Sequence, residues 1–187
     1  MWDNYPTMIS GRKIPAKHIS IIAMSMATGA GLRVAIAIWG MSVPLHWAVA
    51  KIGLTETLTF VNGLTLGVSA GFLTGAGIII VADLAMGWAG AWTPFIAVII
   101  GLIGIIGGLL SGFIRKPGRK FMGLAAVCLT VVSEILQTLW FALFFGIPFL
   151  ETFLMGIPSF VAALINNFVL FTAIGPWLIE FLRRHLE

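Results

Sequence analysis

The stretch LTFVNGLTLGVSAGFLTGAGIIIVADLAM, residues 58–86, decides the fold. It is apolar over 29 residues, which is too long for one membrane-spanning helix and slightly short for two, because one span needs about 20 residues. Three glycines interrupt it: Gly63, Gly67 and Gly71. We therefore predict a short helix over 57–68, a tight glycine turn near Val68–Gly71, and a longer helix over 70–87.

The composition of the whole chain indicates a membrane protein. Hydrophobic residues make up 59% of the 187 residues and the 22 glycines add about 12%, against about 45–50% for soluble domains counted in the same way. Only 10% of the residues are charged. A soluble domain of this size cannot bury so much apolar surface, which excludes a soluble enzyme, a nucleic-acid-binding domain and a disordered tail. Because the apolar runs are continuous instead of alternating, we predict an all-α integral membrane protein and not a β-barrel.

Four further apolar runs complete a prediction of six transmembrane helices. These runs cover residues 19–39, 92–114, 121–145 and 158–182. The mixed segment 41–56 between the first two helices is predicted to be an interfacial loop or a partly inserted segment. Since six helices use about 120 residues, residues 1–187 form a single membrane domain with no room for a second, soluble one.

The eleven Lys and Arg residues predict the orientation. Three lie in the N-terminal segment, four lie in 115–120, two are Arg183 and Arg184, and only Lys51 lies in a loop expected on the other side. The eleventh, Arg33, lies within the first helix, where an acidic partner is expected for it. Basic loops remain cytoplasmic, so an even number of spans must separate the three clusters. Six helices with both termini in the cytoplasm satisfy this condition, whereas a five-helix alternative would leave the N-terminus outside.

Small residues recur at every fourth position on two of the predicted helices. The first helix carries Ala23, Ala27, Gly31 and Ala35, and the fourth carries Gly104, Gly108 and Gly112. In lipid, such rows let helix backbones approach closely. Each row is explained by packing within the bundle, but the flat face of the first helix is equally suited to docking another protein.

In the order and spacing of its features, the chain resembles the substrate-binding S component of an energy-coupling factor (ECF) vitamin transporter. The likeness rests on the small-residue first helix, on the glycine-rich joint at residues 66–75, and on the block DLAMG…AWTPF at residues 83–95. That block is similar to the D-L-x-x-G…P/A-W-T-P pattern of the family, and Gly101-Leu102-Ile103-Gly104 continues it. The resemblance covers roughly residues 19–182.

The resemblance implies a subunit that captures a vitamin or related micronutrient outside a prokaryotic cell. It would deliver this ligand by toppling in the plasma membrane against a transmembrane coupling subunit driven by two cytoplasmic ATPases. In that family the A-x-x-x-A face of the first helix contacts the coupling subunit; Ala23 and Ala27 match it, while Gly31 and Ala35 extend it. The chain begins Met1-Trp2 instead of the Met-His of the nickel and cobalt members, which disfavours a transition-metal substrate.

Ionisable and polar groups within the predicted spans are candidates for ligand binding, since such groups are costly in a bilayer and functional by default. Glu134 lies well inside the fifth span, and Gln137 and Trp140 follow it on one helix face. An acid, an amide and an aromatic plane suit a heteroaromatic or cationic ligand. Alternatively, Glu134 pairs internally, with Arg33 of the first helix as a candidate partner.

Asp83 lies near the outer end of the third helix, before a loop that holds Trp88 and Trp92. We predict that it caps this loop, faces the ligand, or does both, and we include the two tryptophans in the candidate site. Asn166 and Asn167 lie in the middle of the sixth span and point about 100° apart, so at most one of them faces a shared pocket. Asn166 is assigned to the candidate site, with Asn167 as the alternative.

These observations predict a binding subunit and not an enzyme, with no cofactor, resident metal or nucleic-acid partner. No G-x-x-x-x-G-K-[ST] sequence is present, so any ATPase must be a separate chain. The alternative function is a self-contained small transporter or channel in which Glu134 and Asp83 line a cation path. A membrane enzyme that uses the same two acids is least favoured, because H-E-x-x-H, C-x-x-C and serine-nucleophile motifs are missing from the sequence.

Overall fold

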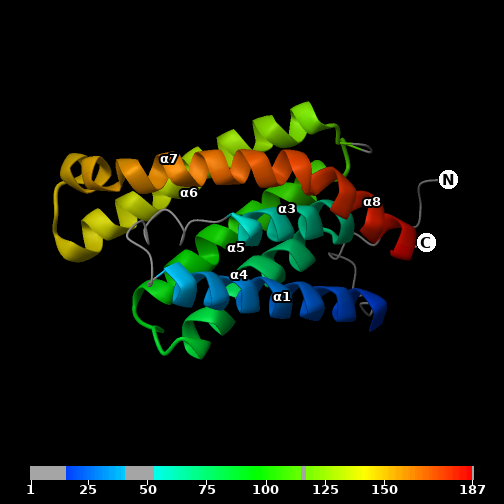
Figure 1. Cartoon of the computed structure of the whole chain (residues 1–187), viewed down its shortest axis with the longest axis horizontal. Helices are drawn as coiled ribbons and strands as arrows, with labels where there is room; N and C mark the ends of the chain where they lie inside the picture. Colours follow the sequence, from blue (N-terminus) through cyan, green and yellow to red (C-terminus); the bar gives the residue numbers. More distant parts are fainter. Residues whose placement is uncertain (1–15, 41–52, 115–116, 187) are drawn as a thin grey trace.

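The computed structural model describes residues 16–40, 53–114 and 117–186, and every regular element within those ranges is an α-helix (Figure 1). The helices are α1 (Ala16–Gly40), α3 (Leu54–Leu66), α4 (Val68–Ala85), α5 (Trp92–Leu110), α6 (Arg119–Phe145), α7 (Phe149–Ala173) and α8 (Gly175–Leu186). Five of these, α1, α4, α5, α6 and α7, are long and apolar enough to cross a membrane. The prediction of an all-helical chain with several apolar helices of membrane-spanning length is confirmed for the described residues, whereas the count of six spans and the orientation of the termini stay predictions.

Helix α3 is the exception in length. Its 13 residues extend about 20 Å at 1.5 Å per residue, which is less than the roughly 30 Å thickness of the hydrocarbon core. It is also a central helix, because most of its side chains are buried and it contacts α1, α4, α5, α7 and α8. In Figure 1, α3 (cyan) begins about halfway along the bundle and runs towards the end at which α1 begins and α8 ends.

The break between α3 and α4 lies at Gly67. Its φ of 99° falls in the left-handed region that only glycine enters freely. The sequence therefore predicted the short helix followed by the long one, but placed the turn at Val68–Gly71, which lies within α4. The two helices accordingly cover residues 54–66 and 68–85, in place of the predicted 57–68 and 70–87.

Glycines allow the backbones of α3, α4 and α5 to pack directly against one another. A Cβ added to Gly71 would lie 2.4 Å from the carbonyl oxygen of Gly104, and a Cβ added to Gly63 would lie 2.1 Å from the same oxygen. A Cβ on Gly108 would lie 2.4 Å from the amide nitrogen of Val68. The close packing predicted for the row on the fourth helix is thus confirmed at Gly104 and Gly108, whereas Gly112 has open space around it.

Helices α6 and α7 form a hairpin whose members pack mainly against each other. Helix α7 differs from the predicted helix over 158–182, because it begins at Phe149, contains Pro158 and ends at Ala173. Membrane helices tolerate an internal proline where neighbouring groups compensate for the lost hydrogen bond. The chain then breaks before Gly175-Pro176, because proline lacks an amide hydrogen, and continues as α8.

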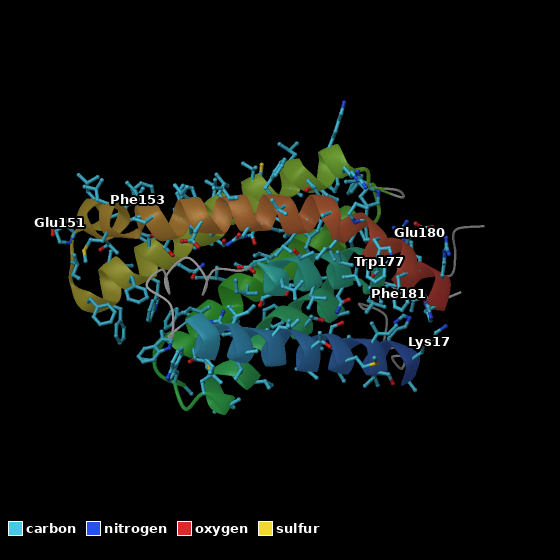
Figure 2. All side chains as sticks on the ribbon, in the orientation of Figure 1. Lys17, Glu151, Phe153, Trp177, Glu180 and Phe181 are labelled. Carbon is cyan, nitrogen blue, oxygen red and sulfur yellow. The ribbon has the colours of Figure 1, made fainter. Side chains whose placement is uncertain are left out.

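The described basic residues gather at one end of the bundle, which we term the basic end. It holds Lys17, Arg119, Lys120, Arg183 and Arg184. Figure 2 shows Lys17 at this end together with Trp177 and Phe181 of α8, while Glu151 lies at the opposite end. Arg33 is the one basic side chain within the described ranges that lies between the two ends. Arg12, Lys13, Lys51, Arg115 and Lys116 are outside the described residues.

Candidate functional site

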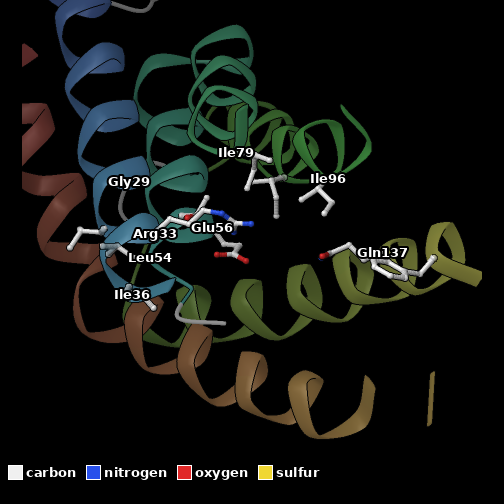
Figure 3. Close-up of a pocket in the computed structure, with 12 residues that line it drawn as sticks. Gly29, Arg33, Ile36, Leu54, Glu56, Ile79, Ile96 and Gln137 are labelled. Carbon is white, nitrogen blue, oxygen red and sulfur yellow. The ribbon is translucent and has the colours of Figure 1, made fainter. Parts of the chain in front are cut away.

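A cavity of about 290 Å³ lies beside the N-terminal turn of α3 (Figure 3). Five helices contribute to its described lining: α1, α3, α4, α5 and α6. Apolar side chains form much of the wall, among them Ile36, Ile79, Ile96, Ile100 and Phe141. The polar members are Arg33, Thr55, Glu56 and Gln137. A volume near 300 Å³ is at the small end of the range for ligand pockets and fits a small metabolite.

The short length of α3 explains the position of the cavity. Because α3 begins about halfway along the bundle, its first residues, Leu54, Thr55 and Glu56, lie among the long helices instead of at a membrane surface. Glu56 lies in the first turn, where the free backbone N–H groups stabilise a negative charge. If α3 were long enough to span the membrane, its first residues would lie at the end of the bundle and not beside the cavity.

Arg33 of α1 forms an ion pair with Asp83 of α4. The distance from Arg33 Nη2 to Asp83 Oδ1 is 3.8 Å, and the side chains are 32% and 5% exposed, respectively. The sequence predicted an acidic partner for Arg33 but suggested Glu134, not Asp83. The Nε atom of Arg33 is buried and makes no hydrogen bond to the described residues. One edge of the guanidinium is therefore held by Asp83, while Nε retains its capacity to donate.

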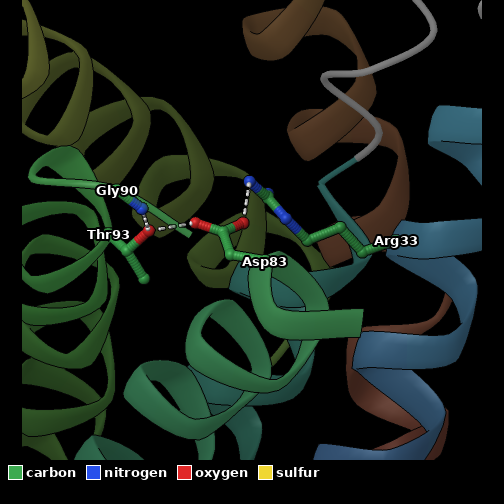
Figure 4. A network of polar contacts seen from close by, with 4 residues as sticks. All are labelled: Arg33, Asp83, Gly90 and Thr93. Carbon is green, nitrogen blue, oxygen red and sulfur yellow. Dashed lines mark hydrogen bonds and ion pairs between the residues drawn. The ribbon is translucent and has the colours of Figure 1, made fainter. Parts of the chain in front are cut away.

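Asp83 also fixes the turn between α4 and α5 (Figure 4). The Thr93 hydroxyl donates to Asp83 Oδ2 at 2.7 Å, and the Gly90 amide donates to the Thr93 hydroxyl oxygen at 3.1 Å. Asp83 therefore caps the loop, which is one of its two predicted roles. It does not belong to the described lining of the cavity and acts on it through Arg33.

Replacing Thr93 by Val tests this network. The change keeps the shape of the side chain but removes the hydroxyl, so Asp83 loses a hydrogen bond to a charged group and the Gly90 amide loses its acceptor. We expect a loss of about 1.5–3 kcal/mol in the free energy of unfolding, measured by thermal unfolding in detergent. Thr93→Ser, which keeps the hydroxyl, is the control and should retain most of the stability. Equal losses in both variants would contradict the assignment.

The structure does not bring the three predicted residues of α6 together in one site; they are Glu134, Gln137 and Trp140. Gln137 lines the cavity. Trp140 belongs to an aromatic contact between α5 and α6, with its ring 5.1 Å from that of Phe95 and 4.9 Å from that of Phe144. Glu134 is half-buried on the same helix and lies outside the described lining.

The remaining predicted residues lie away from the cavity lining. Trp88 and Trp92 flank the turn between α4 and α5 and are partly exposed. Asn166 is half-buried, whereas Asn167 is buried and donates through Nδ2 to the Thr130 hydroxyl of α6 at 2.8 Å. Asn167 thus forms the interhelical bond that a mid-span amide commonly makes.

Two cavity residues, Thr55 and Glu56, were not predicted from the sequence. They fall at the end of the mixed segment 41–56, which was predicted to be an interfacial loop or a partly inserted segment; residues 41–52 of it are outside the described residues. The available signal was Glu56 itself, an acid just before an apolar run, as expected in the first turn of a helix.

The small-residue face of α1 is not used within the described bundle. Its members Ala23, Ala27, Gly31 and Ala35 are all exposed. A Cβ on Gly31 would meet nothing within 4 Å, whereas a Cβ on Gly29 would lie 2.5 Å from Ile78 Cδ1 of α4. The contact of α1 with α4 therefore uses a different face, and packing among the described helices does not explain the predicted row.

The arrangement is suited to binding a small molecule, because a few polar groups of both charges converge within an apolar wall. No family model, no curated protein and no solved structure matches this chain.

Proposed function

We propose that this protein is the substrate-binding membrane subunit of an ATP-driven importer of the ECF type, which captures a vitamin or related micronutrient. The cavity is the observation that carries the proposal: Arg33, Glu56 and Gln137 meet inside a bundle of apolar helices. Polar groups at such depth are retained for a ligand or a transport path. The resemblance of residues 66–112 to S components supports the importer class. It also implies the partners, which are a transmembrane coupling subunit and two cytoplasmic ATPases.

The proposed orientation has the basic end in the cytoplasm of a prokaryotic cell. Five described Lys and Arg residues gather there, as expected for cytoplasmic loops and ends of a plasma-membrane protein. With α3 counted as a short span, six helices place both termini on that side. The turn between α4 and α5, which Asp83 caps, then faces the outside, and the cavity receives its ligand from there.

The exposed face of α1 is the proposed contact for the coupling subunit. Alanines and glycines at four-residue spacing make this face flat, which permits close approach of another helix in lipid. It is exposed along its length, so a partner can reach it without rearranging α1.

The proposed function is tested by purifying the tagged protein from its native membrane and by transport in vesicles. We expect a coupling subunit and two ATPases to co-purify, and we expect ATP-dependent uptake only when all these subunits are present. If vesicles containing this chain alone carry out solute flux, the self-contained transporter is correct. If no ATPase subunits associate, the importer class is wrong.

Replacing Gly31 by Leu tests the proposed coupling face. Because a side chain there meets nothing within 4 Å, the variant should fold with an unchanged melting temperature but bind the coupling subunit at least about tenfold more weakly, roughly 1.4 kcal/mol. Gly156→Leu on α7 is the matched control, since Gly156 also has open space around it. Affinity is measured by titration in nanodiscs. Unchanged binding of Gly31→Leu would remove this face from the interface.

A further inference from the structure

We infer that α8 lies in the headgroup layer of the membrane, where its exposed rings enter the lipid and the basic end binds anionic phospholipids. This inference concerns a surface that the proposed function does not use. It rests on the membrane-spanning length of the other helices and not on the importer assignment, so either can fail without the other.

Helix α8 lies across the basic end and contacts other helices at both of its ends. At its start, a Cβ added to Gly175 would lie 2.5 Å from Met122 Cε of α6. At its end, Leu186 packs against a small apolar cluster from α1, α3 and α4, whose buried members are Ile22, Leu66 and Ala70. In Figure 1, α8 (red) leaves the line of α7 and slants towards the start of α1. Its 12 residues extend about 18 Å, which is too short to cross the hydrocarbon core, so α8 belongs at a membrane surface.

One face of α8 carries an exposed row of rings, which we term the aromatic stripe. It consists of Trp177, Phe181 and His185, at four-residue spacing. The ring centroids of Trp177 and Phe181 lie 5.7 Å apart, and those of Phe181 and His185 lie 4.3 Å apart. Trp177 is 63% exposed and Phe181 is 43% exposed, so the described bundle does not cover the stripe. Rings that combine an apolar body with a polar edge favour the membrane–water interface, which is the position that α8 occupies.

The other two faces of α8 fit the same position. Ile179 and Leu182 are buried against the bundle, whereas Glu180 and Arg184 form an exposed ion pair. Figure 2 shows the tryptophan and phenylalanine of the aromatic stripe on one side of α8 and Glu180 on the other. An amphipathic helix with apolar rings on one face and charges on another lies in the plane of the interface. We therefore place the stripe towards the lipid and Glu180 towards the water.

The charge of the basic end selects the lipid. The described residues place five Lys and Arg side chains there and one acidic side chain, Glu180. Three of the basic residues, Lys17, Arg119 and Lys120, are exposed at the starts of α1 and α6, the two helices that the ends of α8 approach. A positive surface at the level of the headgroups attracts phospholipids with a net negative headgroup, and each Lys or Arg near such a leaflet strengthens binding about fivefold.

The position of the aromatic stripe is tested by spin labelling the full-length protein in nanodiscs. The nitroxide is attached through Phe181→Cys, or through Glu180→Cys on the other face, in a Cys128→Ser background that removes the exposed native thiol. We expect the label at 181 to collide mainly with oxygen, which concentrates in lipid, and the label at 180 to collide mainly with a water-soluble nickel complex. If the nickel complex reaches the label at 181 as readily as the label at 180, the stripe faces water. The surface would then be free for another protein, and the inference is wrong.

The choice of lipid is tested in nanodiscs that mix phosphatidylglycerol with phosphatidylcholine of the same acyl chains. Native mass spectrometry of the released protein counts the lipids that remain bound, and we expect phosphatidylglycerol to be enriched. Combining Arg119→Gln with Lys120→Gln should lower the affinity for phosphatidylglycerol relative to phosphatidylcholine at least about fivefold. Both side chains are exposed, so the melting temperature should not change.

The matched control combines Arg119→Lys with Lys120→Arg, which exchanges the two side chains and keeps both charges. It should retain the enrichment of phosphatidylglycerol. If phosphatidylglycerol is not enriched on the unmodified protein, or if the neutral variant retains as much of it as the control, the basic end does not bind anionic lipid and the inference is overturned.

Discussion

Gly104→Ala is expected to be among the most destabilising single changes in the protein. The added Cβ would lie 2.2 Å from the carbonyl carbon and 2.3 Å from the carbonyl oxygen of Gly71, both of them backbone atoms that no side-chain rotation can move. Ordinary over-packing of a core costs about 1–3 kcal/mol, and a clash between backbones in the middle of α3, α4 and α5 should exceed that range. Thermal unfolding in detergent, followed by circular dichroism, measures the loss.

The matched control is Gly31→Ala on α1. A Cβ at Gly31 meets nothing within 4 Å, and alanine favours a helix by about 1 kcal/mol over glycine, so this variant should be as stable as the wild type or more stable. The close-packed junction would be refuted if Gly104→Ala and Gly31→Ala had similar melting temperatures.

Arg33→Met is the second change with a large expected effect. Asp83, whose side chain is 5% exposed, would lose its ion-pair partner and retain the hydrogen bond from Thr93. Removing one member of a fully buried ion pair costs about 3–5 kcal/mol, because the remaining charge is uncompensated. Arg33 is 32% exposed, so we expect a loss near the lower end of that range. Adding Asp83→Asn to the Arg33→Met variant should recover more than half of this loss, since a neutral amide still accepts from Thr93.

The four combinations of these two changes form a double-mutant cycle. The expected sign is positive coupling, in which the second substitution restores stability lost to the first. If the double variant is instead as unstable as the sum of the single variants, the pair is not the source of the effect and Arg33 contributes through its packing alone.

Much of the fold follows from local sequence signals. Continuous apolar runs predicted α1, α5 and α6 to within a few residues at most ends, and glycines in residues 63–71 predicted the break that Gly67 makes. The largest error lies in the last predicted helix, which was expected to begin at Pro158 and to continue to 182. Neighbouring helices in a membrane permit Pro158 inside α7, and the break lies before Pro176.

The candidate site was less predictable, because it depends on contacts between helices. Helical spacing placed Gln137 and Trp140 on one face, but only the packing of α5 against α6 decides that Trp140 contacts Phe95 while Gln137 lines the cavity. The partner of Arg33 was equally undetermined, since both Glu134 and Asp83 lay at plausible depth in the sequence. Glu56 became a cavity residue only because α3 begins inside the bundle.

The short length of α3 also constrains how the protein enters the bilayer during synthesis. A segment of 13 residues that includes Glu56 and Asn62 is too short and too polar to partition into lipid alone, because insertion requires about 20 apolar residues and penalises charge. It must therefore be carried in with α4 as a helical hairpin bent at Gly67. Its final position is secured only after α5 has been made, since Gly104 and Gly107 supply the surface against which α3 packs.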